Sequence, residues 1–199
     1  MNRILVTPRS LTKEGHPSLR RLSDAGYEVV LSSPGVQPTE EELIKLLDGC
    51  IGMLAGVEQI TARVLKAATT LKVISRNGVG VSNIDLKTAQ ERGIKVLVTA
   101  GTNAQGVAEL TFGLLLALAR SIPFSDFSLK QRRWDRREGF ELENKTLGVI
   151  GCGRIGKRVA SIASAFGMMV CAFDPAPDAS FQLGPHFRYV TLDELLASS

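Results

Sequence analysis

Short apolar runs alternate with amphipathic stretches along the first half of the chain. The apolar runs are typical of buried strands of a parallel sheet, and they occupy residues 4–6, 29–31, 51–54, 71–74 and 94–98. Helix start and stop signals between these runs predict helices near residues 19–25, 39–48, 61–65 and 84–92. Because strands and helices alternate, the pattern indicates a parallel sheet with helices on both faces.

The same alternation restarts in the second half. Residues 104–120 predict a long helix that is apolar on nearly all sides, so we expect it to be deeply buried or to lie in an interface. Pro123 is expected to end this helix, and a charged connection follows it. The later elements are strands near residues 146–150, 169–173 and 189–190, with a helix over residues 154–166.

These elements predict an α/β protein with two parallel-sheet domains, residues 1–98 and 99–199. The second sheet has at most three strands by Ser199, which leaves a wide edge without a partner. We therefore expect both domains to be incomplete and the chain to belong to a longer protein.

Composition excludes several classes of protein. Hydrophobic residues make up 44% and charged residues 22% of the 199 positions, an ordinary globular balance that excludes disorder. The net charge of +4 is too weak to indicate a nucleic-acid partner. The apolar run at residues 110–119 is too short to cross a membrane. Three widely spaced cysteines indicate reduced thiols in the cytoplasm.

A glycine motif carries the strongest chemical signal. Residues 151–156 read Gly-Cys-Gly-Arg-Ile-Gly, directly after a predicted strand and at the start of a predicted helix. In such a motif Gly151 permits a tight turn, Gly153 lets a pyrophosphate approach the backbone, and Gly156 lets the helix pack closely on the strand. Asp174 follows the next strand, where a carboxylate would hold the adenosine ribose and repel a 2′-phosphate. We therefore predict NAD rather than NADP as cofactor.

A second candidate site follows the strand at residues 71–74. Closely spaced glycines in the run from Ser75 to Gly80 favour a nest of N–H groups that suits a substrate carboxylate. An ordinary strand-to-helix loop with a surface arginine explains the same spacing equally well. Thr102 or Asn103 would cap the long helix, and a cap is compatible with a ligand contact.

The remaining polar residues carry weaker signals. His16 and His186 are expected to be surface residues, and Glu109 is explained by its place near a helix start. No spacing of cysteine and histidine resembles a metal site. The arginine-rich run at residues 132–137 is interpreted as a solvated or dimer-contact face, since a single tryptophan is poor support for nucleic-acid binding.

Three stretches together resemble the D-isomer-specific 2-hydroxyacid dehydrogenases, and among them the phosphoglycerate dehydrogenases. They are residues 71–85, 103–120 and 144–175, in the order and spacing of that family. The resemblance implies a flavodoxin-like substrate-binding domain at residues 1–98 and a Rossmann NAD-binding domain from residue 99. It also implies a homodimer built largely on the helix at residues 104–120, and a small 2-hydroxy or 2-keto acid as substrate.

The resemblance also implies roles for individual residues. The cofactor would contact Val79, Val107, Gly151, Gly153, Arg154, Ile155, Gly156 and Asp174. The substrate would contact Ser75, Arg76, Asn77, Gly78, Val79 and Asn103. The family's catalytic Arg, Glu and His are expected after Ser199, so no catalytic residue is assigned within the chain. Ala55 stands where many phosphoglycerate dehydrogenases carry an arginine for the substrate phosphate, which weakens phosphoglycerate as the substrate.

The expected activity is hydride transfer between a D-2-hydroxy acid, 3-phosphoglycerate-like, and NAD. A binding protein that senses NAD(H) without turnover, like the corepressors of this fold, is the alternative. Turnover by the whole protein would distinguish the two.

Overall fold

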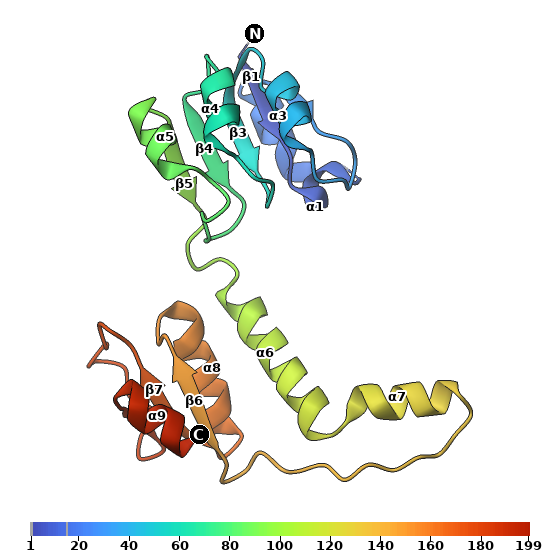
Figure 1. Cartoon of the computed structure of the whole chain (residues 1–199), viewed down its shortest axis with the longest axis vertical. Coiled ribbons are helices and arrows are strands. Elements are labelled where there is room, and N and C mark those ends of the chain that lie inside the picture. Colours follow the sequence, from blue (N-terminus) through green and yellow to red (C-terminus); the bar gives the residue numbers. More distant parts are fainter. Residues whose placement is uncertain (1, 15) are drawn as a thin grey trace. The chain divides into compact units, whose positions relative to one another are not determined.

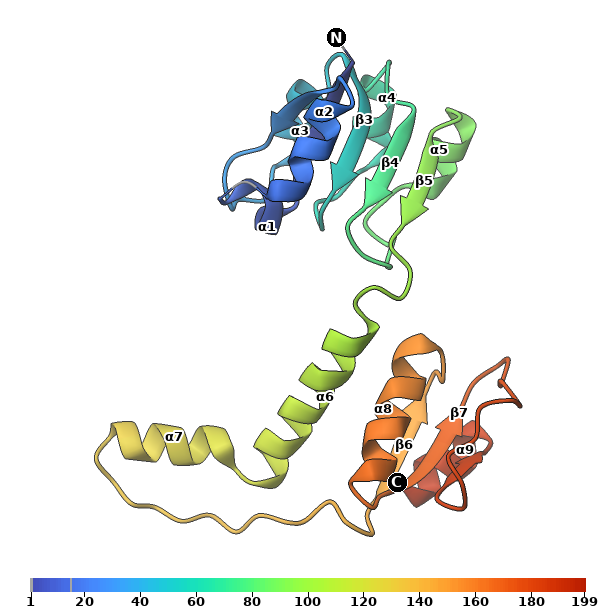
Figure 2. The same cartoon turned by 180° about the vertical axis from the view of Figure 1, so that it is seen from behind.

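The computed structural model describes residues 2–14 and 16–199, which divide into two compact units, residues 1–100 and 101–199. Each unit contains a parallel sheet of its own. Figures 1 and 2 show the two sheets and the helices that cover them. The α/β architecture predicted from the sequence is therefore confirmed.

The first unit contains five strands and short covering helices. The strands are β1 (Arg3–Val6), β2 (Glu28–Leu31), β3 (Cys50–Ala55), β4 (Val73–Arg76) and β5 (Lys95–Val98). The helices are α1 (Arg9–Thr12), α2 (Arg20–Asp24), α3 (Glu40–Leu46), α4 (Ala62–Ala67) and α5 (Leu86–Glu91), with a 3₁₀ turn at Pro17–Leu19. The capping box expected at the start of the second predicted helix is present, with Thr39 and Glu42 bonded reciprocally.

The five strands lie in the order β2-β1-β3-β4-β5, all parallel. This is the flavodoxin-like order, in which the direction of winding reverses between β1 and β3. Helix α2 therefore covers one face of the sheet, and α3, α4 and α5 cover the other (Figures 1 and 2). Sheets of this kind bind ligands at the carboxyl ends of their strands, next to that reversal.

A buried carboxylate ties β1 to β3 at the reversal. Glu58 is 1% exposed, and its Oε1 accepts hydrogen bonds from the Thr7 hydroxyl and, at 2.9 Å, from the Gly56 N–H. The Asn83 amide donates to the Glu58 carbonyl oxygen at 2.7 Å. These bonds fix the loops that follow β1 and β3 relative to each other, so the ligand-binding edge of the sheet is held in one shape.

The second unit contains three strands and four helices among its residues. The helices are α6 (Ala104–Ala119), α7 (Ile122–Lys130), α8 (Arg154–Ala165) and α9 (Leu192–Ser198), and the strands are β6 (Thr146–Ile150), β7 (Met169–Phe173) and β8 (Phe187–Tyr189). The strands are parallel in the order β6-β7-β8, with α8 and α9 on opposite faces (Figures 1 and 2). Helix α6 packs against α8.

Helix α7 was not expected from the sequence, because Pro123 was interpreted as a helix end. The chain instead breaks at Ser121, whose φ of 52° lies in the left-handed region, and Pro123 lies in the first turn of α7. A proline is tolerated there because the first turn of a helix does not use its N–H groups internally. The prediction at Pro123 was therefore wrong in detail: one helix ends before it and another begins around it.

Replacing Glu58 with alanine should lower the free energy of unfolding by about 1–3 kcal/mol, because it removes the acceptor of two buried donors. The matched control is Glu91→Ala at the exposed end of α5, which should change stability by less than about 0.5 kcal/mol. Urea unfolding followed by circular dichroism measures both variants. Equal stability of the two variants would show that the buried carboxylate does not hold this edge.

Candidate functional site

The turn between β6 and α8 has the geometry of a dinucleotide-binding loop. Gly151 has a φ of +89°, a conformation that residues with a side chain rarely adopt, and its N–H donates to the Phe173 carbonyl at 2.8 Å. That bond joins the end of β6 to the end of β7. Helix α8 begins three residues later at Arg154, so its N-terminal N–H groups face the carboxyl edge of the sheet.

The other two glycines of the motif serve different purposes. A Cβ built on Gly156 would lie 2.2 Å from the Gly151 carbonyl oxygen, so only glycine allows α8 to approach the turn this closely. A Cβ built on Gly153 would meet no heavy atom within 4 Å. The space beside Gly156 is therefore filled by the protein's own backbone, whereas Gly153 faces open space of the kind that a pyrophosphate needs.

Asp174 lies beside this turn, immediately after β7. Its Oδ2 accepts a hydrogen bond from the Cys152 N–H at 2.8 Å, and its Oδ1 accepts one from the Ala176 N–H at 2.9 Å. Both bonds come from backbone groups, so the carboxylate is held in a single orientation. Each carboxylate oxygen keeps a further lone pair, which is what a pair of ribose hydroxyls would require.

Cationic side chains gather on the exposed face at the start of α8. The Lys157 ammonium pairs with Asp178 and lies 5.4 Å from the centre of the Phe181 ring. This ammonium, together with Ser180, lowers the pKa of Asp178 to about 2, so the Asp178 carboxylate stays charged at neutral pH. Arg154, Arg158 and Phe181 line the same open cavity, which gives this end of α8 a positive surface.

The other residues predicted to contact the cofactor differ in exposure. Ile155 packs against the core of the second unit, and Val107 in α6 is half-buried. Val79 belongs to the first unit and is 42% exposed. Ile155 therefore offers its backbone rather than its side chain to the phosphate turn.

The predicted substrate loop follows β4 in the first unit. The Asn77 N–H donates to the Ala55 carbonyl at 2.8 Å, and the Gly78 N–H donates to the Thr99 hydroxyl at 2.9 Å. These two N–H groups are therefore used inside the fold. The N–H groups of Val79 and Gly80 have no hydrogen-bond partner among residues 2–14 and 16–199, so the unused donors of the loop lie at its last two residues.

Ser75 and Arg76 form the end of β4, and both are half-buried. The Arg76 guanidinium bonds to the Asn77 carbonyl through Nη1, while its buried Nε has no partner in the described part of the chain. Arg76 therefore shapes the loop from within.

Asn103 is the N-cap residue of α6, yet its side chain makes no capping hydrogen bond. The side chain is exposed, so its amide remains available to a ligand. Glu109 is bonded to Gln105 within the same helix, which agrees with a role in that helix.

Both histidines have local partners. The Nδ1 atom of His16 accepts from the Ser18 N–H at 3.2 Å, and Nδ1 of His186 lies 3.1 Å from the Met169 sulfur. Burial, ahead of the influence of the neighbouring Cys152 thiol, raises the pKa of Tyr189 to about 12, so its hydroxyl stays protonated at neutral pH.

Two features of residues 2–14 and 16–199 bear on other functions. No group of three or more histidine, cysteine or acidic side chains in these ranges could hold a metal ion. No single described helix is long and apolar enough to cross a membrane, although α6 and α7, bent by 65° relative to each other, are long and apolar enough when taken together.

Sequence reasoning missed two parts of the site. Glu58, which fixes the edge of the first sheet, carries only the weak signal of an acidic residue just after a buried strand. The pair of Lys157 with Asp178 joins residues 21 positions apart, and no local pattern predicts it.

Comparison with known proteins places the chain in a family. Residues 4–193 match the model of the D-isomer specific 2-hydroxyacid dehydrogenase catalytic domain, and the chain belongs to this family. It is 43% identical to the hydroxypyruvate reductase of Thermotoga maritima over 164 residues, which cover 80% of the chain and 52% of that protein. It is 48% identical to the D-3-phosphoglycerate dehydrogenase of Methanocaldococcus jannaschii over 140 residues, or 69% of the chain and 27% of that protein.

Solved structures agree with this assignment. A Thermus thermophilus protein superposes with a TM-score of 0.86 at 36% identity, covering 99% of the chain and 62% of that structure. The NAD⁺-bound 3-phosphoglycerate dehydrogenase of Entamoeba histolytica gives 0.77 at 29% identity, over 99% of the chain and 60% of that structure. The D-lactate dehydrogenase of Aquifex aeolicus, in complex with NAD and lactic acid, superposes with a TM-score of 0.78 at 30% identity. The match covers 98% of the chain and 58% of that structure. The chain thus spans about half or less of the two curated relatives named above.

The two glycines that differ in surroundings give a matched pair of variants. Gly156→Ala should destabilise the second unit by about 1–3 kcal/mol, because its methyl group overlaps the Gly151 carbonyl. Gly153→Ala has room for its methyl group, and replacing glycine by alanine at this N-cap should cost no more than about 1 kcal/mol. Thermal unfolding of the two variants measures the difference. If both melt with the wild type, α8 does not depend on close approach to the turn.

Proposed function

We propose that the second unit binds NAD at the turn between β6 and α8. The open side of Gly153 and the N-terminus of α8 would receive the pyrophosphate, with Arg154 and the backbone of Ile155 beside it. Asp174 would accept hydrogen bonds from the adenosine ribose. Three observations together support this proposal. Backbone contact leaves no room for a side chain at Gly156, Gly153 faces open space, and two backbone N–H groups orient the carboxylate of Asp174.

The first unit would hold the substrate. The two free N–H groups of Val79 and Gly80 suit a carboxylate, and the loop from Ser75 to Val79 is fixed by bonds to Ala55 and Thr99. Asn103, whose amide is not used as a helix cap, would add a polar contact. Val79 and Val107 would border the nicotinamide.

The whole protein would transfer a hydride between a D-2-hydroxy acid and NAD. NAD, when bound, supplies the acceptor of the hydride from C2 of the hydroxy acid. The residues of this chain bind and orient the two reactants, whereas proton transfer needs a group within hydrogen-bond reach of the substrate oxygen. We assign that step to the catalytic Arg, Glu and His of the family, and we assign none of these roles to a residue of this chain.

Family membership and the named relatives, which are a reductase and dehydrogenases, favour this activity over an NAD(H) sensor without turnover. The substrate would be a small acid of the hydroxypyruvate or 3-phosphoglycerate kind. The position of the phosphate-binding arginine is occupied by Ala55, which is completely buried and favours an unphosphorylated acid.

The whole protein should oxidise NADH in the presence of hydroxypyruvate or phosphohydroxypyruvate. The loss of the absorbance of the reduced nicotinamide measures this reaction. A higher kcat/KM for hydroxypyruvate would agree with Ala55. A polypeptide limited to residues 1–199 is the control and should show no turnover, because no catalytic residue is assigned within it. Tight NADH binding by the whole protein without turnover of any 2-keto acid would support the sensor instead.

Asp174→Ala should weaken NAD binding about ten- to a hundredfold, because hydrogen bonds to a charged acceptor are lost. It should also reduce the preference for NAD over NADP, because the repulsion of a 2′-phosphate disappears. Asp174→Asn keeps an acceptor for the Cys152 N–H and isolates the effect of the charge. Asp193→Ala, on the exposed side of α9, should bind both cofactors like the wild type. Wild-type protein that used NADP as well as NAD would refute this role of Asp174.

The second unit also carries an exposed apolar stripe that suits a homodimer. Leu110, Leu114 and Leu118 lie four residues apart on α6 and are 63%, 64% and 72% exposed. An apolar stripe of this size on a helix marks an interaction site. We propose that a second copy of the chain covers it.

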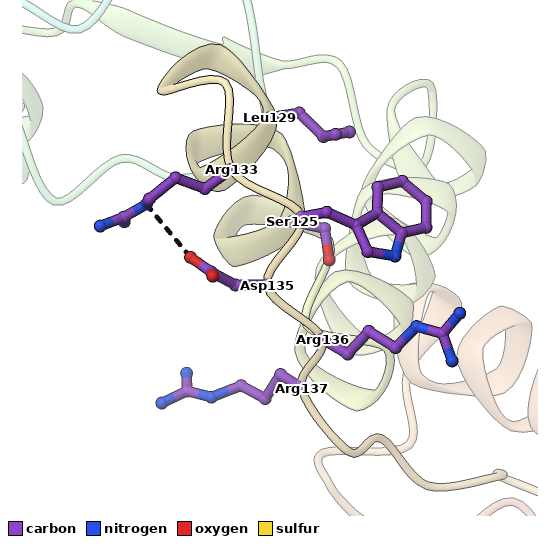
Figure 3. Close-up of a pocket in the computed structure, with 7 residues that line it drawn as sticks. Ser125, Leu129, Arg133, Asp135, Arg136 and Arg137 are labelled. Atoms are coloured by element: carbon purple, nitrogen blue, oxygen red, sulfur yellow. Dashed lines mark ion pairs between the residues drawn. The ribbon is translucent and has the colours of Figure 1, made fainter.

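Figure 3 shows the segment that follows α7, and its Arg137 lines a cavity together with Leu114 and Leu118 of α6. Arg133 pairs with Asp135 at 3.2 Å, and the Arg137 guanidinium lies 4.7 Å from the centre of the Phe124 ring. Trp134 beside them is 75% exposed. Arginine and tryptophan are enriched at interfaces, which favours the dimer-contact interpretation of this run.

The three cysteines are free, and we propose a cytoplasmic location on that basis.

The double variant Leu114→Glu with Leu118→Glu should convert the dimer to a monomer in analytical ultracentrifugation, because two charges would be buried without partners. Ser161→Glu on the exposed face of α8 is the control and should remain dimeric. Wild-type protein that sediments as a monomer would exclude the proposed interface.

A further inference from the structure

One ion pair ties the segment that follows Asp174 to helix α8. The Lys157 ammonium pairs with the carboxylate of Asp178, which lies four residues beyond Asp174. Lys157 belongs to the first turn of α8, and its N–H donates to the Gly153 carbonyl at 2.9 Å. The pair therefore joins the proposed phosphate turn to the segment that begins at the proposed ribose carboxylate.

The Asp178 carboxylate is held in its orientation by its own loop. Its Oδ1 accepts from the Ser180 N–H at 3.0 Å and from the Ser180 hydroxyl at 2.6 Å, which leaves Oδ2 for the ammonium. The Phe181 N–H donates to the Asp178 carbonyl at 3.0 Å. Phe181 packs in turn against Phe187 of β8, with ring centres 5.1 Å apart. The carboxylate would therefore keep its place even if the lysine were removed.

The lysine is the adaptable partner of the pair. Its side chain is 30% exposed, and it lines an open cavity of about 460 Å³ together with Arg154, Ser161 and Phe181. A lysine side chain is a flexible stem with a point charge at its end. Without the carboxylate of Asp178, the ammonium would be free to turn towards another anion at this end of α8.

The ion pair lies close to the proposed ribose position. The Tyr189 hydroxyl has both the Cys152 thiol and the Asp178 backbone as neighbours. The Cys152 N–H is the group that donates to the Asp174 carboxylate. Asp174 and Asp178 are therefore close in space as well as in sequence. A phosphate on the 2′ oxygen of a ribose bound at Asp174 would lie beside the pair, where salt screens charges incompletely because the Debye length is about 8 Å.

We propose that Asp178 favours NAD over NADP by withholding the Lys157 ammonium from the 2′-phosphate. This inference rests on the proposed cofactor site. A phosphate monoester carries a charge of about −1.5 to −2 at neutral pH, and Asp174 repels it directly. An unpaired ammonium nearby would offset part of that repulsion, whereas an ammonium paired with a carboxylate presents no net charge. Asp174 and Asp178 thus select the same cofactor in two different ways.

The test compares the affinities of the whole protein for NADPH and NADH by isothermal titration calorimetry. All variants carry Asp174→Asn, which removes the direct repulsion and keeps an acceptor for the Cys152 N–H. Adding Asp178→Asn retains an acceptor for the Ser180 N–H and removes the charge that holds Lys157. This change should raise the affinity for NADPH relative to that for NADH about two- to fivefold, the range expected of one exposed ion pair.

Further variants assign the gain to the lysine. Lys157→Gln, added to Asp178→Asn, should abolish the gain, whereas Lys157→Arg keeps the positive charge and should retain it. The matched control is Asp126→Asn, which breaks the lysine–aspartate pair of Asp126 with Lys130 on α7 and should leave the ratio unchanged. A gain that survives Lys157→Gln would show that the charge of Asp178 acts alone, and it would overturn the role of Lys157.

Failure of this inference is distinguishable from failure of the cofactor site. Wild-type protein that bound neither NADH nor NADPH would contradict the proposed function, and the role of Asp178 would fall with it. NADH binding that is weakened by Asp174→Ala, together with an unchanged ratio of NADPH to NADH affinity in Asp178→Asn, would refute the role of Asp178 alone.

Discussion

The close approach of α8 to the end of β6 is the constraint on which the cofactor site depends. Gly156 lies so near the Gly151 carbonyl that a side chain there would collide with backbone. Because the helix starts this close to the strand, its N-terminal N–H groups reach the carboxyl edge of the sheet. The same turn brings the Cys152 N–H to Asp174, so the carboxylate and the phosphate turn form one unit.

In the first unit, the loops at the carboxyl edge of the sheet are held in place by side chains and not by a glycine-rich helix start. Its ligand edge lies where the direction of winding reverses between β1 and β3, and the loops that leave these strands have no regular hydrogen bonds to join them. Glu58 supplies the link through Thr7 and Gly56. Thr99 does the same for the loop after β4 by receiving the Gly78 N–H. Side chains from distant positions therefore hold the substrate edge in shape.

The distribution of charge follows the same division. In the second unit the cations at the start of α8 lie near the phosphate turn, and Asp178 neutralises Lys157. In the first unit the carboxylate of Glu58 is buried and hydrogen-bonded, so it acts on the backbone and not on solvent. The proposed cofactor side therefore combines the cations at the start of α8 with the carboxylates of Asp174 and Asp178, whereas the proposed substrate loop offers the N–H groups of Val79 and Gly80.

Patterns local in the chain were enough to determine the parallel α/β architecture, the glycine motif with Asp174, and the capping box of Thr39 and Glu42, because periodicity and short-range hydrogen bonds depend on neighbours in sequence. Helix α7 was missed because Ser121 adopts a left-handed conformation that no local pattern announces. Only the tertiary structure decided which N–H groups of the substrate loop remain free, since Ala55 and Thr99 reach that loop from other strands. It also decided the positions of Glu58 and of the pair between Lys157 and Asp178, because these contacts join residues that folding, and not sequence spacing, brings together.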